Sequence, residues 1–544
     1  PGLAALAARP SVFLFSNYIW CHHENQQLSE MVKRINPHNL AIHGGPDTPK
    51  YAGDVEVYFA EHPNVDITVR GEGELTLAHL LDVLRGHLGD GPPDLSVLAD
   101  VPGLSYRAPD GSVVHTADRE RQTELDEIPS PVLTGLFDGF RAAASSSFVI
   151  LETNRGCPYG CTFCDWGSAT LSRIRKFDLD RVFAELEWCA SNGMSYVVLA
   201  DANFGIFERD VEIAQRIADL RAEYGTPATV GTNYAKNTVK HLSKIIDIFA
   251  SAGIVAEGKV SLQTMDQETL TVIKRKNIKV EKYNDLSVEF RKNDLPLSVE
   301  LMMGLPGSTP EAFRQDLQEC IARDVRTMVY PTILLPNSPM NDPAYREEHG
   351  IVARAGERVM QSATFSFEEW QQMERLTQVF LLCDLFGVLR QVSMFVHQET
   401  GLREVDLYEQ LRMVARHESD RWPIIALTLN ALPDLMTSPV SWKLWIDEIH
   451  RYLVEVCEVP DDATLAAVLD VQHALLPARN RQFPVVLDLP HDYGGWYNAM
   501  IEVKDDGYGL DWPDRVPPLR SFPPATFTVD DPSGLCNFGL GHRM

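Results

Sequence analysis

A series of short apolar runs, alternating with amphipathic segments after about residue 147, constrains the fold most strongly. Six runs have the length and the β-branched or aromatic content of strands, at 147–153, 195–201, 228–234, 258–264, 297–304 and 327–335. Segments with helical spacing lie between them, such as 180–193 and 309–324. Strands joined by helices form parallel sheets. Because six such units are too few for a closed eight-stranded barrel, the pattern predicts a partial barrel with its site at the carboxyl ends of the strands.

A second, shorter α/β pattern precedes this series. Strand-like runs lie at 11–16, 39–45 and 65–74, and helical spacing at 24–35 and 75–86. Gly44, Gly45, Gly71 and Gly73 fall at the carboxyl ends of the predicted strands, where open α/β sheets bind ligands. Residues 104–120, with Asp110-Gly111 in the middle, predict a hairpin.

The chain length predicts about three domains. We expect an α/β fold with a first domain at 1–125, the partial barrel at 126–345 and a mostly helical domain at 346–544. The last assignment depends on long amphipathic segments such as 366–390, followed by the strand-like FPVVLDL and a Pro/Gly-rich tail. The first domain starts abruptly, without an initiator Met, and we expect it to be incomplete at its N-terminus.

Composition narrows the class of protein. A hydrophobic content of 44% and a charged content of 23% are typical of globular chains. The sequence has no apolar stretch of about 18 residues and no secretory signal pattern, so we expect a cytoplasmic protein without membrane contact. A net charge of −27 disfavours binding to nucleic acid. Nine cysteines, six of them scattered singly, do not make a disulfide framework.

Three of the cysteines are crowded into eight residues. The stretch NRGCPYGCTFC, residues 154–164, places Cys157, Cys161 and Cys164 at C-x3-C-x2-C spacing directly after a predicted strand. Structural zinc requires four closed ligands, and no fourth Cys or His lies at a local spacing. A 4Fe–4S cluster with one open iron suits three thiolates better. Zinc and chance remain the alternatives.

The sequence ETNRGCPYGCTFCDWG resembles the cluster loop of radical S-adenosylmethionine (SAM) enzymes, in which this loop follows the first strand of a partial (βα)6 barrel. Phe163, before the last cysteine, is part of the resemblance. The resemblance implies that Cys157, Cys161 and Cys164 bind three irons and that SAM chelates the fourth.

Further positions follow from this resemblance one at a time. Asp201 and Asn203 end the second strand, where the family contacts the SAM amino group, although the chain departs there from the usual G-G-E-like form. Gln263 resembles the position that contacts the ribose. Gly304, Pro306 and Gly307 resemble a motif that packs near the adenine, and a plain turn is the alternative for these glycines.

The first α/β pattern is similar to the cobalamin-binding, Rossmann-like half of B12-dependent radical SAM enzymes, through FSNYIW, AIHGGPDT and DITVRGEGE. The positions that this similarity implies for cobalamin are Ser16, Tyr18, Trp20, Gly44, Gly45, Gly71, Glu72, Gly73 and Glu74. The D-x-H-x-x-G fingerprint is absent, and His22 and His23 are interpreted as surface residues. The resemblance therefore implies cobalt without a protein histidine, its lower face covered by Trp20 or Tyr18.

The resemblance implies a radical C-methyltransferase that acts on a natural product or its precursor, through methylcobalamin and a 5′-deoxyadenosyl radical. An electron donor such as flavodoxin or ferredoxin would be its partner. Alternatives are a polar methylase of an sp2 carbon such as tryptophan C2, a cyclase or rearrangement enzyme with both cofactors, and a non-catalytic iron–sulfur or zinc module. Tyr330 is a candidate catalytic residue, with a core tyrosine as the alternative, and the aromatics of 494–500 are candidates for capping the pocket.

Overall fold

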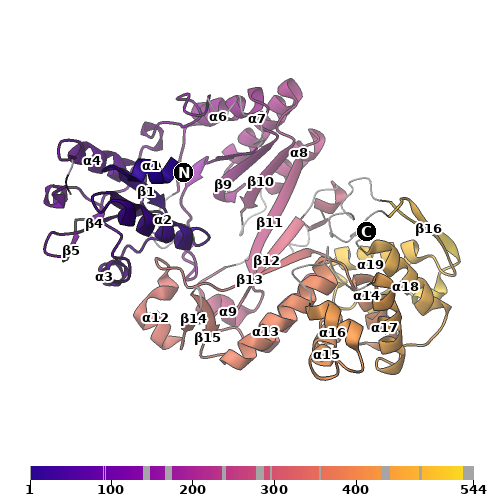
Figure 1. Ribbon diagram of the computed structural model, residues 1–544. Coiled ribbons are helices and arrows are strands. Elements are labelled where there is room, and N and C mark those ends of the chain that lie inside the picture. The colour runs from indigo at the N-terminus through magenta and orange to yellow at the C-terminus, as the bar shows by residue number, and fades with distance from the viewer. Residues whose placement is uncertain are drawn as a thin grey trace.

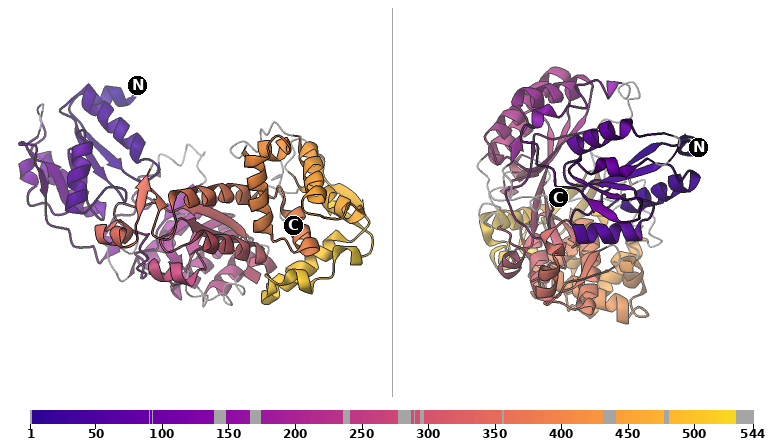
Figure 2. Two further views of the ribbon diagram at one scale, coloured as in Figure 1. Left: turned by 90° about the horizontal axis from the view of Figure 1, so that it is seen from below. Right: turned by 90° about the vertical axis from the view of Figure 1, so that its left-hand side faces the viewer.

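The computed structural model describes residues 2–89, 91, 93–138, 148–165, 174–235, 241–276, 287–288, 290–293, 297–354, 357–430, 441–476 and 481–530. A six-stranded sheet occupies the middle of the molecule. A separate N-terminal sheet and a group of C-terminal helices lie at its two opposite ends (Figures 1 and 2).

The central sheet is entirely parallel. Its strands are β6 (Phe148–Leu151), β9 (Tyr196–Phe204), β10 (Thr229–Tyr234), β11 (Val255–Gln263), β12 (Leu297–Met303) and β13 (Arg326–Pro331). They lie side by side in chain order, from β6 at one edge to β13 at the other. The connecting helices include α6 (Leu179–Ser191), α7 (Arg209–Tyr224), α8 (Leu242–Ser251), α9 (Gln267–Val272) and α11 (Pro310–Ala322). The predicted series of six strands is therefore confirmed.

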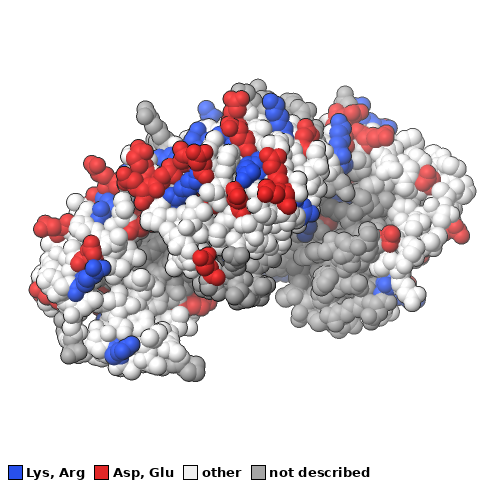
Figure 3. Space-filling view, turned by 90° about the horizontal axis from the view of Figure 1, so that it is seen from above, with Lys and Arg blue, Asp and Glu red and all other residues white. Residues whose placement is uncertain are grey.

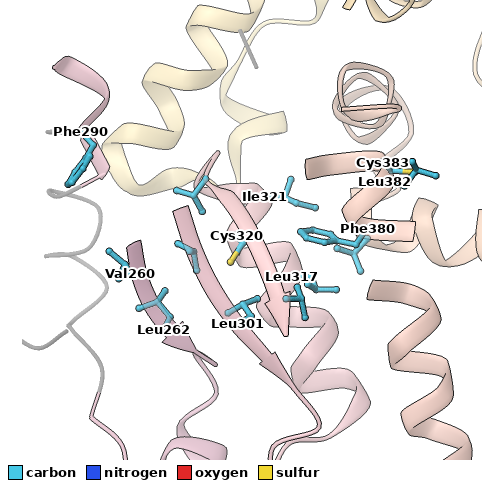
Figure 4. Close-up of a cluster of buried hydrophobic side chains, with 14 of the residues drawn as sticks. Val260, Leu262, Phe290, Leu301, Leu317, Cys320, Ile321, Phe380, Leu382 and Cys383 are labelled. Atoms are coloured by element: carbon cyan, nitrogen blue, oxygen red, sulfur yellow. The ribbon is translucent and has the colours of Figure 1, made fainter. Parts of the chain in front are cut away.

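Side-chain alternation gives the two faces of this sheet different chemistry. Val260, Leu262 and Leu301 are buried against the helical layer, where Leu317 and Cys320 of α11 meet them (Figure 4). Burying one such aliphatic side chain contributes about 1.5–3 kcal/mol. The alternate positions on the same strands are more polar and point to the opposite, inner face; they include Lys259, Ser261, Glu300 and Tyr330.

The N-terminal sheet, called here the first sheet, has five strands in chain order. β1 (Val12–Ser16), β2 (Leu40–Gly44) and β3 (Ile67–Val69) are parallel, and β4 (Leu104–Arg107) and β5 (Val113–His115) are added antiparallel. Its helices are α1 (Gly2–Ala7), α2 (His22–Ile35), α3 (Ala52–Glu61) and α4 (Gly73–Arg85). The predicted hairpin is confirmed as β4–β5, with Gly111 in its turn at φ 86°.

The C-terminal part of the chain is built mainly from helices. They are α12 (Pro343–Glu348), α13 (Phe367–Phe380), α14 (Arg390–Thr400), α15 (Glu404–His417), α16 (Pro423–Asn430), α17 (Trp442–Glu455), α18 (Ala463–Leu475), α19 (Tyr493–Val503) and α20 (Trp512–Arg515). Two short ladders accompany them, β14 (Val352–Arg354) with β15 (Arg358–Gln361) and β16 (Val485–Leu489) with β17 (Ala525–Val529).

The aromatics of 494–500 do not cap a pocket. Trp496 and Tyr497 on α19 are 0% and 3% exposed, and the Trp496 indole N–H donates to Gln398 Oε1 at 2.8 Å. They belong to the core between the C-terminal helices, and the capping prediction is wrong.

In the described part of the chain, no single helix is long and apolar enough to span a membrane. The helical segments 367–385 and 390–400 reach that length and apolarity only when they are counted as one span, and they are bent by 99° relative to each other.

A buried ion-pair network joins these helices to the central sheet. Arg390 at the start of α14 is 1% exposed and pairs with Asp384, on the π-helical turn η4 (Leu381–Leu385), and with Asp324, just after α11. Burial alone would lower the pKa of the Arg390 guanidinium, but the two carboxylates hold it well above its ordinary value. The arginine is therefore held in its charged form.

Replacing Arg390 by methionine should lower the free energy of unfolding by about 3–5 kcal/mol, because two buried carboxylates would lose their counter-charge. Chemical denaturation monitored by far-UV circular dichroism measures this loss. Lys443→Met is the matched control, since its ion pair with Asp447 is solvent-exposed and should be worth less than about 1 kcal/mol. Equal losses in the two variants would contradict the assignment.

Candidate functional site

The loop that carries the three cysteines, residues 156–165, is called here the cluster loop. It begins just after β6 and the two-residue strand β7 (Asn154–Arg155). β7 pairs antiparallel with β8 (Arg175–Lys176), so the chain returns beside the start of the loop. Cys157 is buried, and Cys161 and Cys164 are half-buried. The Cys164 amide donates to the Cys161 carbonyl at 3.3 Å, which forms a tight turn between these two cysteines.

The middle of the cluster loop is held by hydrogen bonds to segments far away in the sequence. The Thr162 amide donates to the Ile273 carbonyl at 3.0 Å, and the Thr162 carbonyl accepts from the Met340 amide at 2.8 Å. The Tyr345 hydroxyl lies 3.2 Å from the Thr162 hydroxyl and donates to the Val272 carbonyl at 3.1 Å. The end of α9 and residues 340–345 thus hold the backbone between the cysteines.

Polar groups suited to thiolates surround the sulfur atoms. The Asn203 side-chain amide donates to Cys157 Sγ at 3.4 Å, and Arg275 donates to Cys161 Sγ at 3.8 Å. The Arg275 guanidinium also lies over the Phe163 ring, 5.8 Å from its centroid. Burial lowers the pKa of Arg275, and the three cysteine sulfurs act in the opposite direction. One buried cation is therefore close enough to interact with all three thiols.

This donor set fits an iron–sulfur cluster in its chemistry. Three cysteines on one loop, a neighbouring cation and an amide donor all favour the thiolate form that binds iron. In the described part of the chain, no three His, Cys, Asp or Glu side chains already stand close enough together to hold a metal ion. The fit therefore lies in the number, spacing and surroundings of the cysteines. Arg275 was missed by the sequence analysis, because an arginine inside the basic run KRK is typical of a solvated surface.

Asp201, predicted to contact the SAM amino group, binds the chain itself. Its carboxylate is fully buried and accepts from the Thr153 amide at 2.8 Å, the Thr153 hydroxyl, the Asn154 amide at 3.3 Å and the Asn154 side-chain amide at 2.7 Å. Thr153 and Asn154 lie between β6 and the cluster loop. Asp201 therefore fixes the point at which the loop leaves the sheet.

Burial raises the pKa of Asp201 from 3.8 to about 6, against the opposing effect of its hydrogen bonds. The folded state thus binds a proton more tightly than the unfolded state, and this group should destabilise the fold progressively as pH rises from about 4 to about 6. Asp201→Asn removes that titration and places an amide donor opposite other donors, at a cost of about 1–3 kcal/mol. We expect the stability gap between wild type and variant to narrow as pH rises from 5 to 7. Urea denaturation at several pH values measures the gap, and a constant gap would contradict the shift.

Gln263 and Gly304 both have left-handed backbones at the carboxyl ends of neighbouring strands. Gln263 ends β11 at φ 69° and is 9% exposed. A non-glycine residue in this region is strained, and such strain concentrates at functional sites. Gly304 follows β12 at φ 82°, and a Cβ there would lie 3.1 Å from the Val359 carbonyl oxygen and 3.2 Å from Trp370 Nε1. The turn that holds Gly304 and the buried Pro306 is therefore packed closely against β15 and α13.

Tyr330 lies on β13, the edge strand of the central sheet. Its side chain is 45% exposed, whereas the adjacent Val329 is 7% exposed and faces the helical layer. The core-tyrosine interpretation of Tyr330 is therefore wrong. Tyr330 pairs in register with Met302 of β12 and points to the inner face.

The glycines that follow β2 approach the backbone of this chain. Gly45 has φ 93°, and a Cβ there would lie 2.6 Å from the Asn17 carbonyl oxygen and 2.8 Å from the Asn17 amide nitrogen. A Cβ at Gly44 would contact Val69 of β3 at 3.4 Å. By contrast, no described heavy atom lies within 4 Å of a Cβ built at Gly71, which has φ 73°. Among the four glycines predicted to approach a ligand, Gly71 is therefore the one whose Cβ position has no described atom close to it.

Gly45→Ala should be more destabilising than Gly111→Ala by about 1–3 kcal/mol, the range for overpacking a rigid site. Both positions have positive φ and share the strain of a left-handed alanine, but no described atom lies near the Gly111 Cβ position. Thermal unfolding of the two variants measures the difference. Equal losses of stability in the two variants would show that the backbone around Asn17 can move away from the added methyl group without an energetic cost.

Two exposed aromatic rings stand beyond the carboxyl end of β1. Tyr18 and Trp20 are 39% and 72% exposed and stack on each other with centroids 4.7 Å apart. Ser16 is the last residue of β1. His22 begins α2, but it is not the surface residue that the sequence predicted, because its side chain is only 22% exposed and its Nδ1 lies 2.5 Å from Asp47 Oδ2. His23 is exposed, as predicted.

The two glutamates of the GEGE turn, predicted to bind a cofactor, pair with arginines beside the cluster loop. Glu74 Oε1 lies 2.7 Å from an Nη atom of Arg155, and Glu72 Oε2 accepts from Arg175 at 3.0 Å. Gly73 is the first residue of α4, so both carboxylates lie at a helix N-terminus. These pairs could not be predicted from the sequence, because the glutamates follow a strand of the first sheet and the arginines lie on the separate β7–β8 ladder.

A cavity of about 560 Å³ lies beside the edge strand β6. Apolar side chains, such as Phe148, Ile150 and Trp188, make up most of its lining. Glu74 and Arg155 also line it. None of the three cysteines is among its lining residues, so this cavity is separate from the sulfur atoms.

Comparisons with known proteins agree with this geometry. Residues 151–320 match the family model of the radical SAM superfamily. The chain is 34% identical over 436 residues to a 2-(S-pantetheinyl)-carbapenam-3-carboxylate methyltransferase of Streptantibioticus cattleyicolor, which covers 75% of this chain and 62% of that protein. It is 33% identical over 429 residues to the cobalamin-dependent radical SAM methyltransferase TokK of Streptomyces tokunonensis, covering 74% and 61% of the two chains.

Among solved structures, the radical SAM methyltransferase TsrM of Kitasatospora setae, with tryptophan and a SAM analogue bound, superposes with a TM-score of 0.48 at 20% identity. That match covers 63% of this chain and 66% of TsrM. The present chain spans about 62% of the length of the carbapenam methyltransferase.

Proposed function

We propose that this chain is a radical SAM enzyme, because residues 151–320 match the family model of that superfamily. The activity is cobalamin-dependent methylation of a carbon in a natural product or its precursor. One observation carries the proposal. The cluster loop, at the carboxyl end of β6, is in direct contact with the carboxyl-end turns of a separate α/β sheet. The carboxyl-end edges of two α/β sheets, where such sheets bind ligands, thus lie next to each other, and the chain is similar in sequence to two such methyltransferases.

In this proposal Cys157, Cys161 and Cys164 hold a 4Fe–4S cluster. Residues at the neighbouring strand ends would hold SAM: Phe163, Asn203, Gln263, Gly304 and Pro306, with Asp201 acting through Thr153 and Asn154. The carboxyl edge of the first sheet would hold cobalamin, through the exposed rings of Tyr18 or Trp20 and through Gly71, where the backbone is open. When bound, the cluster with SAM supplies one-electron chemistry at carbon and cobalamin supplies the methyl group.

The chain's own task is to position these groups and to exclude water. Asp201 fixes the start of the cluster loop, and the end of α9 and residues 340–345 hold Thr162, so the sulfur atoms sit on a backbone that is held at several points. Asn203 and Arg275 stabilise thiolates at Cys157 and Cys161.

The inner face of the central sheet would bind the substrate. Tyr330 is exposed there, Ser261 donates to Glu300 at 2.6 Å, and Lys259 lies on the same face of β11. These polar side chains suit a substrate with hydrogen-bonding groups, such as a functionalised small-molecule natural product. An electron donor such as flavodoxin or ferredoxin completes the proposal.

Anaerobic turnover with SAM, cobalamin, a reductant and a pool of candidate substrates tests the activity. We expect S-adenosylhomocysteine and 5′-deoxyadenosine in coupled amounts, together with a product heavier by one carbon, all measured by mass spectrometry. Cys161→Ser should lose cluster iron and both SAM products. Cys457→Ser is the matched control, because Cys457 is half-buried in the C-terminal part and should leave the iron content unchanged.

The ratio of products separates this proposal from its alternatives. A methylated product with S-adenosylhomocysteine and no 5′-deoxyadenosine would replace the radical route by a polar one. Release of 5′-deoxyadenosine without added carbon would replace methyl transfer by cyclisation or rearrangement.

A further inference from the structure

We propose that Glu72, Glu74, Arg155 and Arg175 form a charge clamp that holds the first sheet against the stem of the cluster loop. The two glutamates are then positioning residues, which act on the reaction through the loop and not by binding a cofactor. The inference about the reaction rests on the proposed function, whereas the clamp itself does not.

The arginine half of the clamp is built by the β7–β8 ladder. Arg155 and Arg175 are direct partners in this antiparallel pairing, so their side chains start from adjacent backbone positions. Both are largely buried, with side chains 18% and 12% exposed. Two neighbouring cations in a half-buried place repel each other unless anions lie between them. Glu152, which pairs with Arg155 at 2.8 Å, is one such anion, and the others come from outside this segment.

The glutamate half comes from a single turn of the first sheet. Glu74 pairs with Arg155 at 2.7 Å, and Glu72 accepts two hydrogen bonds from Arg175, one of them at 3.0 Å. Burial would raise the pKa of Glu72, but the hydrogen bond and charge of Arg175 hold it below the ordinary value. Burial likewise would lower the pKa of Arg155, and Glu74 and Glu152 reverse that effect. Both carboxylates therefore serve as counter-charges for the ladder.

The glycines explain how one turn delivers both carboxylates. β3 ends at Val69, and Gly71, two residues later, has φ 73°. Gly73 is the first residue of α4. Glu72 and Glu74 thus lie two residues apart at the start of a helix, where the helix dipole also favours negative charge. That dipole alone could account for two surface glutamates, but not for their pairing with two arginines of a different sheet.

A second contact holds the other end of the cluster loop. Asp165, directly after Cys164, pairs with Lys50 at 3.3 Å. The segment that carries Lys50 is itself bound by Asn337, which donates to the Pro46 and Thr48 carbonyls at 2.9 Å each. Turns that follow β2 and β3 thus hold both ends of the loop. Movement of the first sheet would move the cysteines.

The clamp should be sensitive to salt. Glu72 and Glu74 side chains are 29% and 39% exposed, and Glu74, Glu152 and Arg155 line the cavity beside β6. Half-exposed ion pairs are weakened by dissolved ions more than buried pairs are. High ionic strength should therefore reproduce part of the effect of removing the glutamates.

Hydrogen–deuterium exchange of the full chain tests the clamp without any cofactor. In Glu72→Gln/Glu74→Gln we expect amides in peptides covering 154–165 to exchange about fivefold faster, as expected for the loss of modest ion pairs. Glu56→Gln/Glu61→Gln on α3 is the matched control, since it removes the same charge from exposed positions. Adding Arg175→Gln to the glutamate variant should cause little further change, because Glu72 is the carboxylate that pairs with Arg175. Unchanged exchange at 154–165, or full additivity, would overturn the clamp.

A catalytic readout then tests the positioning role. Under the turnover conditions above, the clamp variant should release several times more 5′-deoxyadenosine per methylated product than wild type, while iron and cobalamin contents stay the same. A lower overall rate at an unchanged ratio would indicate a structural role only and would overturn positioning. If wild type makes no methylated product, the proposed function fails, but the exchange result still decides the clamp.

Discussion

The hydrogen bonds that the buried Asp201 carboxylate accepts from Thr153 and Asn154 determine how the rest of the site is built. They join the second strand of the central sheet to the segment that follows the first, and the cluster loop starts two residues after Asn154. A carboxylate in this position costs desolvation energy, which backbone and amide donors offset. Every other support of the loop, from Thr162 to Arg275, acts on a backbone whose starting point is already set.

The first sheet contributes to the same site by contacts of another kind. Its strand-end turns reach the loop and the β7–β8 ladder through charged side chains, Lys50, Glu72 and Glu74. Charged contacts fix direction and register but tolerate water, which suits a boundary next to which ligands must enter. By contrast, the C-terminal helices join the central sheet through the fully buried Arg390 network. The two ends of the molecule are thus attached by ion pairs that differ in burial.

The order of strands and the position of the cysteine loop could be predicted from sequence, because both depend on local periodicity and spacing. The β4–β5 hairpin was predictable for the same reason, through Asp110-Gly111. Contacts between distant segments could not be predicted. Nothing near Arg275 indicates that it reaches Cys161, 114 positions earlier, and nothing near Glu74 indicates Arg155. The capping prediction for Trp496 and the core alternative for Tyr330 are both wrong, since an aromatic residue suits a core and a pocket equally well and only the fold decides between them.

The division of the central strands into an apolar and a polar face has an evolutionary consequence. Val260, Leu262 and Leu301 stabilise the fold through the helical layer, while Lys259 and Glu300 project from the same two strands, and Tyr330 from the neighbouring β13, to the other side. Mutations at the second set leave the hydrophobic core untouched. Under the proposed function, substrate specificity can therefore drift without loss of foldability, by exchange of a few side chains at alternate positions of β11, β12 and β13.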